Sequence, residues 1–272
     1  MNKENLLILL PVYNDCRSLK KLLAELNSKF KTLKFIIKIL IVDDASKEKL
    51  KINFLNFKYI NKIKVLRLKT NVGNQKAILY GLKYINKTNY NGIISVMDAD
   101  GEDDPKKLEL LIKKLKENKD DFIVAARRKR TENFTLKLLN FFRLILTFIF
   151  TGKYVNFGNY SCFYSKNLKK IIKDKSILLA YCATLQKYNI IKISIDKKKR
   201  YYDKSKANFI FLFSHSINII SVFFRQFLIR SIFLLVFFFA IQKNLSIFNI
   251  LAVIILILNL MIILNYLKKT VH

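Results

Sequence analysis

The sequence predicts an α/β domain with a mostly parallel sheet, followed by a hydrophobic C-terminal segment. Between Leu6 and Ala126, short apolar runs alternate with amphipathic stretches, which is the pattern of strands and helices that follow one another along the chain. From Phe227 onward the sequence is nearly free of charge, and its run Leu245–Leu267 is long enough to cross a membrane as a helix.

Short apolar runs are expected to form five buried strands, at Leu6–Val12, Phe35–Val42, Ile63–Leu68, Ile93–Met97 and Phe122–Ala126. Amphipathic helices are expected between them, at Ser18–Phe30, Asn74–Asn86 and Pro105–Asn118. In a sheet built from such units, a ligand binds beyond the carboxyl ends of the strands.

Polar clusters follow three of these strands at the point where each ends. Tyr13-Asn14-Asp15 follows the first strand, Asp43-Asp44 the second and Asp98-Ala99-Asp100 the fourth. Because parallel strands end at the same edge of a sheet, we expect the three clusters to converge on one crevice.

The segment from Asp98 to Asp104 holds five carboxylates in seven positions. Such crowding is costly through like-charge repulsion unless a cation is present. Oxygen ligands suit Mg²⁺ or Mn²⁺, which in turn bind diphosphates. The alternative is a solvated turn in which Asp103 or Asp104 caps the helix that begins near Pro105. We expect metal binding at Asp98 and Asp100, and capping at the later two.

The amino-acid composition indicates which class of partner the chain binds. Fifty Lys and Arg against nineteen Asp and Glu give a net charge of +31, which is typical of proteins with polyanionic partners. The chain lacks the aromatic signatures and the helix-turn-helix pattern of nucleic-acid-binding proteins. The charge is then either a solvated basic surface or a surface attracted to anionic lipids, at roughly 1 kcal/mol for each Lys or Arg near the membrane.

The cysteines, Cys16, Cys162 and Cys182, lack metal-binding spacing and are expected to be reduced thiols. The N-terminus does not resemble a signal peptide. The soluble part is therefore expected to stay in the cytoplasm.

The C-terminal part is expected to contact the membrane. Phe134–Phe150 is interpreted as a helix in the interface or the core, and Asn208–Phe224 has a similar composition. Phe227–Ile241 and Leu245–Leu267 predict a hairpin of two spans, of which the first is short. Positive charge before and after the hairpin places both ends in the cytoplasm. The expected organisation is a catalytic domain at 1–206, an interfacial helix at 207–226 and the membrane hairpin at 227–269.

Four motifs resemble the successive signatures of family 2 glycosyltransferases with the GT-A fold. They are Leu10-Pro11-Val12-Tyr13-Asn14-Asp15, Ile41-Val42-Asp43-Asp44-Ala45-Ser46, Asn71-Val72-Gly73-Asn74-Gln75-Lys76 and Met97-Asp98-Ala99-Asp100. Within that family the chain is similar to the polyprenyl-phosphate branch, because Arg200-Tyr201-Tyr202-Asp203-Lys204-Ser205-Lys206 resembles the branch's R-x-x-G-x-S-K element. Asp203 stands where that element has glycine, which permits positive φ more readily.

The resemblance implies a set of site residues. The nucleotide pocket would be lined by Pro11, Tyr13, Asp15, Val42, Asp43, Asp44, Lys76, Asp98 and Ala99. The metal would be held by Asp98, Asp100 and Glu102. Arg127, Arg200 and Lys206 would contact phosphates of the donor and acceptor.

A further departure from the family concerns the catalytic base. Many members carry an Asp-containing stretch where this chain has Asn156-Phe157-Gly158-Asn159. An amide cannot act as a general base, so Asn159 is expected only to orient an oxygen of the acceptor.

The resemblance implies an inverting transfer from a UDP- or GDP-sugar to polyprenyl phosphate at the cytoplasmic membrane, with Mg²⁺ or Mn²⁺ as cofactor. Two alternatives stay open: transfer to a sugar hydroxyl of a glycan or glycolipid, and a membrane-tethered sugar-nucleotide-binding protein without catalysis. Assembly into a homo-oligomer is left open as well.

Overall fold

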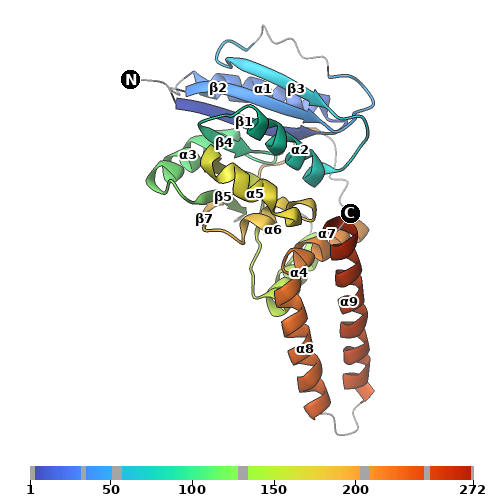
Figure 1. Ribbon diagram of the computed structural model, residues 1–272. Coiled ribbons are helices and arrows are strands. Elements are labelled where there is room, and N and C mark those ends of the chain that lie inside the picture. The colour runs from blue at the N-terminus through green and yellow to red at the C-terminus, as the bar shows by residue number, and fades with distance from the viewer. Residues whose placement is uncertain are drawn as a thin grey trace. The chain divides into compact units, whose positions relative to one another are not determined.

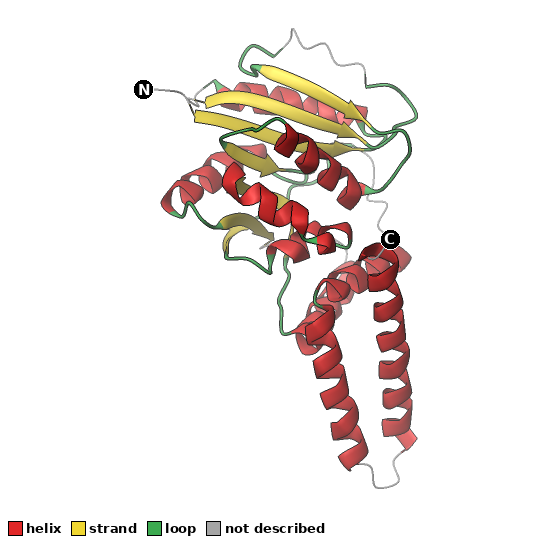
Figure 2. Cartoon of the chain, viewed as in Figure 1, coloured by secondary structure: helices red, strands yellow, loops and turns green. Residues whose placement is uncertain are grey.

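The computed structural model describes residues 4–31, 35–50, 57–127, 134–202, 209–241 and 246–270. The chain divides into two compact units (Figure 1). The first comprises Met1–Thr131, Asn156–Asp174 and Leu185–Ser205, and the second comprises Glu132–Val155, Lys175–Thr184 and Lys206–His272. Strands occur in the first unit, whereas the second is helical (Figure 2).

A seven-stranded sheet in the order β3-β2-β1-β4-β6-β5-β7 forms the centre of the first unit. Its strands are β1 (Glu4–Val12), β2 (Phe35–Asp43), β3 (Lys62–Arg67), β4 (Ile93–Val96), β5 (Phe122–Arg127), β6 (Phe157–Tyr164) and β7 (Ile190–Ile195). β6 is antiparallel to both of its neighbours, β4 and β5. The other neighbouring strands are parallel. The predicted α/β class with a mostly parallel sheet is therefore confirmed.

The five predicted strands are present, but β6 and β7 were not predicted. β6 is buried along most of its length, so its sequence shows no alternation of apolar and polar residues. It also contains Gly158 and Asn159, which are depleted in strands. β7 was missed although Ile191 to Ile195 alternate apolar and polar residues, which is the pattern of a half-buried strand.

Helices cover both faces of the sheet. They are α1 (Cys16–Phe30), α2 (Asn74–Lys87), α3 (Leu108–Glu117), which follows the 3-10 turn η2 (Pro105–Lys107), and α5 (Leu168–Lys173), which follows η3 (Ser165–Asn167). α1 and α3 contribute to the main apolar core together with strand residues such as Ile8 and Ile39. α2 packs on the opposite face, where Gly81 lies against Leu9 and Val42.

The predicted cap of the third helix is also found. The side chain of Asp104 accepts a hydrogen bond from the backbone N–H of Lys106 at 3.0 Å, immediately before Pro105. The cysteines are free thiols, as the sequence predicted.

The second unit contains the hydrophobic C-terminal helices. Its elements are α4 (Phe134–Thr151), η4 (Lys175–Leu178), α6 (Tyr181–Leu185), α7 (Phe209–Val222), α8 (Phe224–Ile241) and α9 (Ser246–Thr270). α8 and α9 lie side by side (Figure 1), and the Ser231 hydroxyl donates to the Asn259 side chain across this pair at 2.8 Å. Both helices expose large apolar side chains, including Phe233, Phe237 and Leu260.

Length and composition single out one helix in the described part of the chain as able to cross a membrane, Phe248–Thr270. This helix overlaps the predicted second arm, Leu245–Leu267. The predicted first arm, Phe227–Ile241, does not qualify by itself; Phe224–Ala240 passes only together with Phe213–Val222, from which it is bent by 98°. Two spans, the side of the membrane and the boundaries at 206 and 226 stay predictions.

The turn before β4 yields a stability prediction. Gly92 has φ +147°, and a Cβ there would lie 2.5 Å from the carbonyl oxygen of Asn5. Gly92→Ala therefore adds a backbone clash to conformational strain and is expected to destabilise the chain by about 2–5 kcal/mol. Gly73→Ala is the matched control, because Gly73 has φ +85° but nothing within 4 Å of its Cβ position. It should lose only about 1–2 kcal/mol. Equal losses in thermal unfolding of the two variants would contradict the packing assigned to Gly92.

Candidate active site

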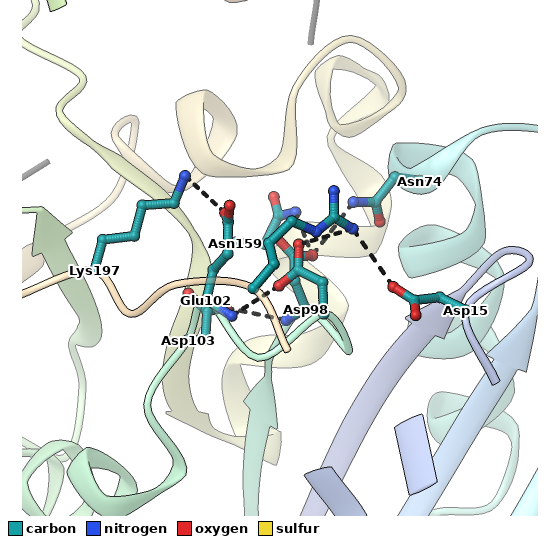
Figure 3. A network of polar contacts seen from close by, with 9 residues as sticks. Asp15, Asn74, Asp98, Glu102, Asp103, Asn159 and Lys197 are labelled. Atoms are coloured by element: carbon teal, nitrogen blue, oxygen red, sulfur yellow. Dashed lines mark hydrogen bonds and ion pairs between the residues drawn. The ribbon is translucent and has the colours of Figure 1, made fainter. Parts of the chain in front are cut away.

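Of the three polar clusters expected to converge, those that follow β1 and β4 are linked at the carboxyl ends of these strands. Their connection is Arg200, whose guanidinium lies 3.4 Å from the Asp15 carboxylate and 3.4 Å from the Asp100 carboxylate. Figure 3 shows the network of polar contacts to which Asp15, Asp98 and Glu102 belong. One cation thus links two clusters that are far apart in the sequence.

Asp98 is held by two amides from different elements. Its Oδ1 accepts from the Asn159 side chain on β6 at 3.0 Å and from the Asn74 side chain at the start of α2 at 3.3 Å (Figure 3). Its backbone N–H donates to the Asp103 carboxylate at 3.0 Å. These contacts fix Asp98 without neutralising its charge, since amides carry none.

Asp100 carries a perturbed carboxyl in the acidic loop, residues 98–104. Burial, followed by the charges of Asp98 and Glu102, raises its pKa to about 6, against the lowering effects of the Glu102 N–H and of Arg200. Its Oδ1 accepts from the backbone N–H of Glu102 at 2.9 Å. Burial and the neighbouring carboxylates therefore outweigh the stabilising contacts that Asp100 makes with the Glu102 N–H and Arg200.

Glu102 is paired with a lysine that sequence reasoning did not identify. The Lys197 ammonium lies 2.7 Å from its carboxylate, and both side chains are mostly buried, with 11% and 18% exposed. Lys197 belongs to the run Lys197-Lys198-Lys199-Arg200, which follows β7. Four consecutive basic residues stand out in the sequence, but their position beside the acidic loop follows only from β7, which ends just before them.

The segment after β7 lies along the acidic loop through its backbone as well. The N–H of Lys198 donates to the Glu102 carbonyl and the N–H of Tyr201 to the Asp100 carbonyl, each at 3.0 Å. The Tyr201 ring lies against Gly101, which has φ +87° and leaves no space for a side chain. We call residues 197–202 the basic strap.

Oxygen atoms are the only donors that the acidic loop offers to a cation, which fits a hard divalent metal. Within the described residues, however, no three His, Cys, Asp or Glu side chains are grouped so that they could hold a metal ion. Asp98 and Asp100 would therefore supply only part of a coordination sphere. This arrangement suits Mg²⁺ or Mn²⁺, which commonly use one or two carboxylates together with substrate phosphates.

The Asp43-Asp44 pair after β2 is buried and stabilises loops. Asp43 accepts from the Ser46 N–H at 2.9 Å and forms an ion pair with Arg67 at 3.2 Å. Both oxygens of Asp44 accept hydrogen bonds of 2.8 Å, from the N–H groups of Val72 and Gly73. This contact sets the loop that places Asn74 at the start of α2.

A cavity of about 370 Å³ adjoins Asp15, within the size range of small-molecule sites. It is lined by residues after β1 and β2, namely Asn14, Asp15, Cys16, Arg17, Ser46, Lys47, Glu48 and Leu50. Asn14 joins its two walls, because its N–H donates to Ser46 at 2.9 Å and its side chain accepts from the Lys47 N–H at 2.7 Å.

The other predicted site residues fall into three groups. Pro11, Val42 and Ala99 are buried at strand ends, whereas Tyr13 and Lys76 are exposed. Arg127 ends β5, but its side chain lies outside the described part of the chain, as do Asp203 and Lys206. Of the three predicted cations, the structure therefore places only the Arg200 side chain in the site. Asn74 and Lys197 are site residues that were not predicted individually.

Comparison with known proteins finds a relative of similar sequence and solved structures of similar fold. An uncharacterized glycosyltransferase of Synechocystis is 31% identical over 144 residues, which is 51% of this chain but only 43% of that protein. Mannosyl-3-phosphoglycerate synthase from Rubrobacter xylanophilus matches with a TM-score of 0.54 at 14% identity, over 89% of this chain and 77% of that one. Glucosyl-3-phosphoglycerate synthase from Mycobacterium tuberculosis, solved with Mn²⁺ and UDP, matches with a TM-score of 0.50 at 12% identity, over 82% and 80%.

These two likenesses concern the fold alone, and they agree with the predicted GT-A architecture. The family itself is shown by sequence, because the pattern that defines glycosyl transferase family 2 matches residues 7–192, well over half of the chain. The chain belongs to glycosyl transferase family 2.

Proposed function

We propose that this chain is a metal-dependent inverting glycosyltransferase that moves a sugar from a UDP- or GDP-sugar to a polyprenyl phosphate. The observation that carries the proposal is the acidic loop after β4. There Asp98 and Asp100 lie at the carboxyl end of the sheet, and Arg200 bridges Asp100 to Asp15 beside the cavity.

The nucleotide would occupy the cavity beside Asp15, and its diphosphate would lie toward Asp98 and Asp100. A related fold, glucosyl-3-phosphoglycerate synthase, has been solved with Mn²⁺ and UDP, which supports a divalent metal in this chain. Asp98 and Asp100 would hold that metal, and when bound it would supply positive charge for the departing diphosphate. Arg200 would add a fixed cation on the same side.

Asn159 supports a phosphate acceptor. Its side-chain amide already donates to Asp98 at 3.0 Å, and an amide cannot take up a proton from a hydroxyl. A sugar hydroxyl normally depends on a general base, which contributes typically about 10²–10⁴-fold. A phosphate monoester is largely dianionic at neutral pH and attacks without one, as its second pKa of about 6 implies. The acceptor oxygen then bonds to the anomeric carbon, the bond to the diphosphate breaks, and the nucleoside diphosphate leaves.

The apolar helix α9 supports a membrane location for this reaction. Its segment Phe248–Thr270 meets the requirements of a spanning helix, and it ends in Lys268 and Lys269. Basic residues at the end of a span favour the cytoplasmic side. We therefore propose that the catalytic domain acts at the cytoplasmic surface, where a lipid-linked acceptor is available.

Membranes that contain the full chain should transfer radiolabel from one UDP- or GDP-sugar to added polyprenyl phosphate, measured after lipid extraction. Excess EDTA should abolish the transfer, and Asp100→Ala should reduce it at least about 100-fold, since it removes a metal ligand. Lys113→Ala, on an exposed position of α3, is the matched control and should retain activity.

Free oligosaccharide acceptors offered in parallel separate the alternatives. Transfer to a sugar hydroxyl with none to polyprenyl phosphate would refute the acceptor class. Full activity in EDTA would refute the metal. Retained nucleotide binding without transfer to either acceptor would favour a binding protein without catalysis.

The raised pKa of Asp100 predicts how its removal changes stability with pH. An acid whose folded-state pKa lies above its ordinary value favours folding while protonated, and that stability is lost as pH rises through about 6. Without metal, Asp100→Asn should therefore stabilise the chain at pH 7.5, by at most about 3 kcal/mol, and this gain should shrink toward pH 4.5. Thermal unfolding in EDTA measures both. A gain that is independent of pH would contradict the electrostatic origin of the effect.

A further inference from the structure

A second cavity lies in the sheet unit at the opposite ends of the strands from the acidic loop. It has a volume of about 320 Å³ and is lined by the amino-terminal parts of β1, β2 and β3, the end of α2 and the turn before β4. α2 runs from the carboxyl ends of the strands back toward this region (Figure 1). The proposed reaction at Asp98 and Asp100 does not use this cavity.

Three lysines line the cavity, and strand register places them on one face of the sheet. Lys38 on β2 pairs directly with Lys62 on β3, and Leu40 pairs with Lys64. Side chains alternate between the faces of a strand, so Lys62 and Lys64 share a face with Lys38. Farther along β2 the same face carries Leu40 and Val42, both buried. On this face of β2, the apolar residues give way to Lys38 at the cavity.

Like charges directly opposite one another destabilise a sheet. Among the described residues, no carboxylate lies within ion-pair distance of these lysines, and the cavity lining includes no Asp or Glu. The Lys38 ammonium lies over the Tyr90 ring at 5.8 Å from its centre, which offsets only part of its charge. The cavity therefore presents three positive charges without a negative partner from the described chain.

Protection of a sheet edge does not account for this cluster. Lysines on edge strands prevent edge-to-edge pairing, and β3 is such a strand, which explains Lys62 and Lys64 individually. Lys38, however, lies on β2, between β1 and β3. Its position opposite Lys62 adds repulsion and protects no edge.

The walls of the cavity are fixed by packing. The Tyr90 hydroxyl donates to the Ile93 carbonyl at 3.1 Å, and Gly92 brings this turn against Asn5 so closely that a Cβ would lie 2.5 Å from the Asn5 carbonyl oxygen. Tyr84 of α2 forms another wall, and Leu7 contributes buried apolar surface. The site thus combines three cations with aromatic and aliphatic surface.

We propose that this cavity is a binding site for a phosphate monoester with an attached apolar or ring group. A phosphate monoester carries about −1.5 to −2 charges at neutral pH and several acceptor oxygens, which matches three ammonium groups better than a single carboxylate does. The attached group would lie against Tyr84, Tyr90 and Leu7. The ligand is either a soluble organic phosphate or the head group of a lipid phosphate.

Calorimetric titration of the purified full chain in detergent tests the site, with phenyl phosphate and dihexanoyl phosphatidic acid as the soluble and lipid probes. The titrations are done in excess EDTA, so that phosphate binding at the proposed metal-dependent active site is suppressed. At least one probe should bind, and Lys62→Glu combined with Lys64→Glu should weaken its binding at least tenfold. Lys169→Glu with Lys170→Glu, two exposed lysines of α5, makes the same change in net charge and should alter binding less than twofold. Phenyl sulfate, which has one charge fewer, should bind more weakly than phenyl phosphate.

The tighter of the two phosphate probes identifies the source of the ligand. No binding of either probe at millimolar concentration, or equal loss in both double variants, would overturn the proposal. Thermal unfolding confirms that each variant is folded, and Lys62→Gln with Lys64→Gln, which introduces no negative charge, should also weaken binding. Sugar transfer is measured separately, so failure of this site leaves the proposed reaction independently testable.

Discussion

Charge repulsion among the carboxylates of the acidic loop is the constraint that determines how the candidate active site is built. Asp98, Asp100 and Glu102 follow one another at alternate positions after β4, and burial together with the charges of Asp98 and Glu102 raises the pKa of Asp100. Two cations from the segment that follows β7 offset part of this repulsion. Lys197 pairs with Glu102, and Arg200 lies between Asp100 and Asp15. These ion pairs hold the basic strap beside the carboxylates that we propose as metal ligands.

Sheet topology explains how such distant residues meet. β6 inserts antiparallel between β4 and β5 and brings Asn159 to Asp98, while β7, parallel to β5, delivers the strap to the same end of the sheet. The buried Asp44 carboxylate orders the loop before α2 and so positions Asn74. Neutral amides orient Asp98, Lys197 pairs with Glu102, and Arg200 offsets the charge of Asp100 only in part. Asp98 and Asp100 are therefore the carboxylates that we propose as metal ligands.

Local sequence pattern was sufficient for the first half of the fold. Apolar runs and amphipathic periods predicted β1 to β5 and α1 to α3, and strand ends predicted where Asp15 and Asp98 converge. Pattern failed for β6, because a strand buried along most of its length has no alternation. β7 does alternate from Ile191 to Ile195, but this short pattern was overlooked. Because β7 was not predicted, the ion pair between Lys197 and Glu102 could not be predicted either, and Glu102 was predicted only as a metal ligand. Arg127 and Lys206 stay predictions, since their side chains lie outside the described part of the chain.

The most direct test of this account is the effect of Lys197→Met on thermal unfolding with and without Mn²⁺ and a nucleoside diphosphate. Removing one partner of a mostly buried ion pair costs about 3–5 kcal/mol, so without metal the variant should unfold at a clearly lower temperature. Mn²⁺ with the nucleoside diphosphate that the chain binds, UDP or GDP, should then raise the midpoint of the variant more than that of the unmodified chain, because an added cation replaces the lost charge. Lys187→Met, which breaks the Lys187–Asp174 pair of 3.1 Å, should show no such extra gain. Equal gains in the variant and the unmodified chain would contradict the account.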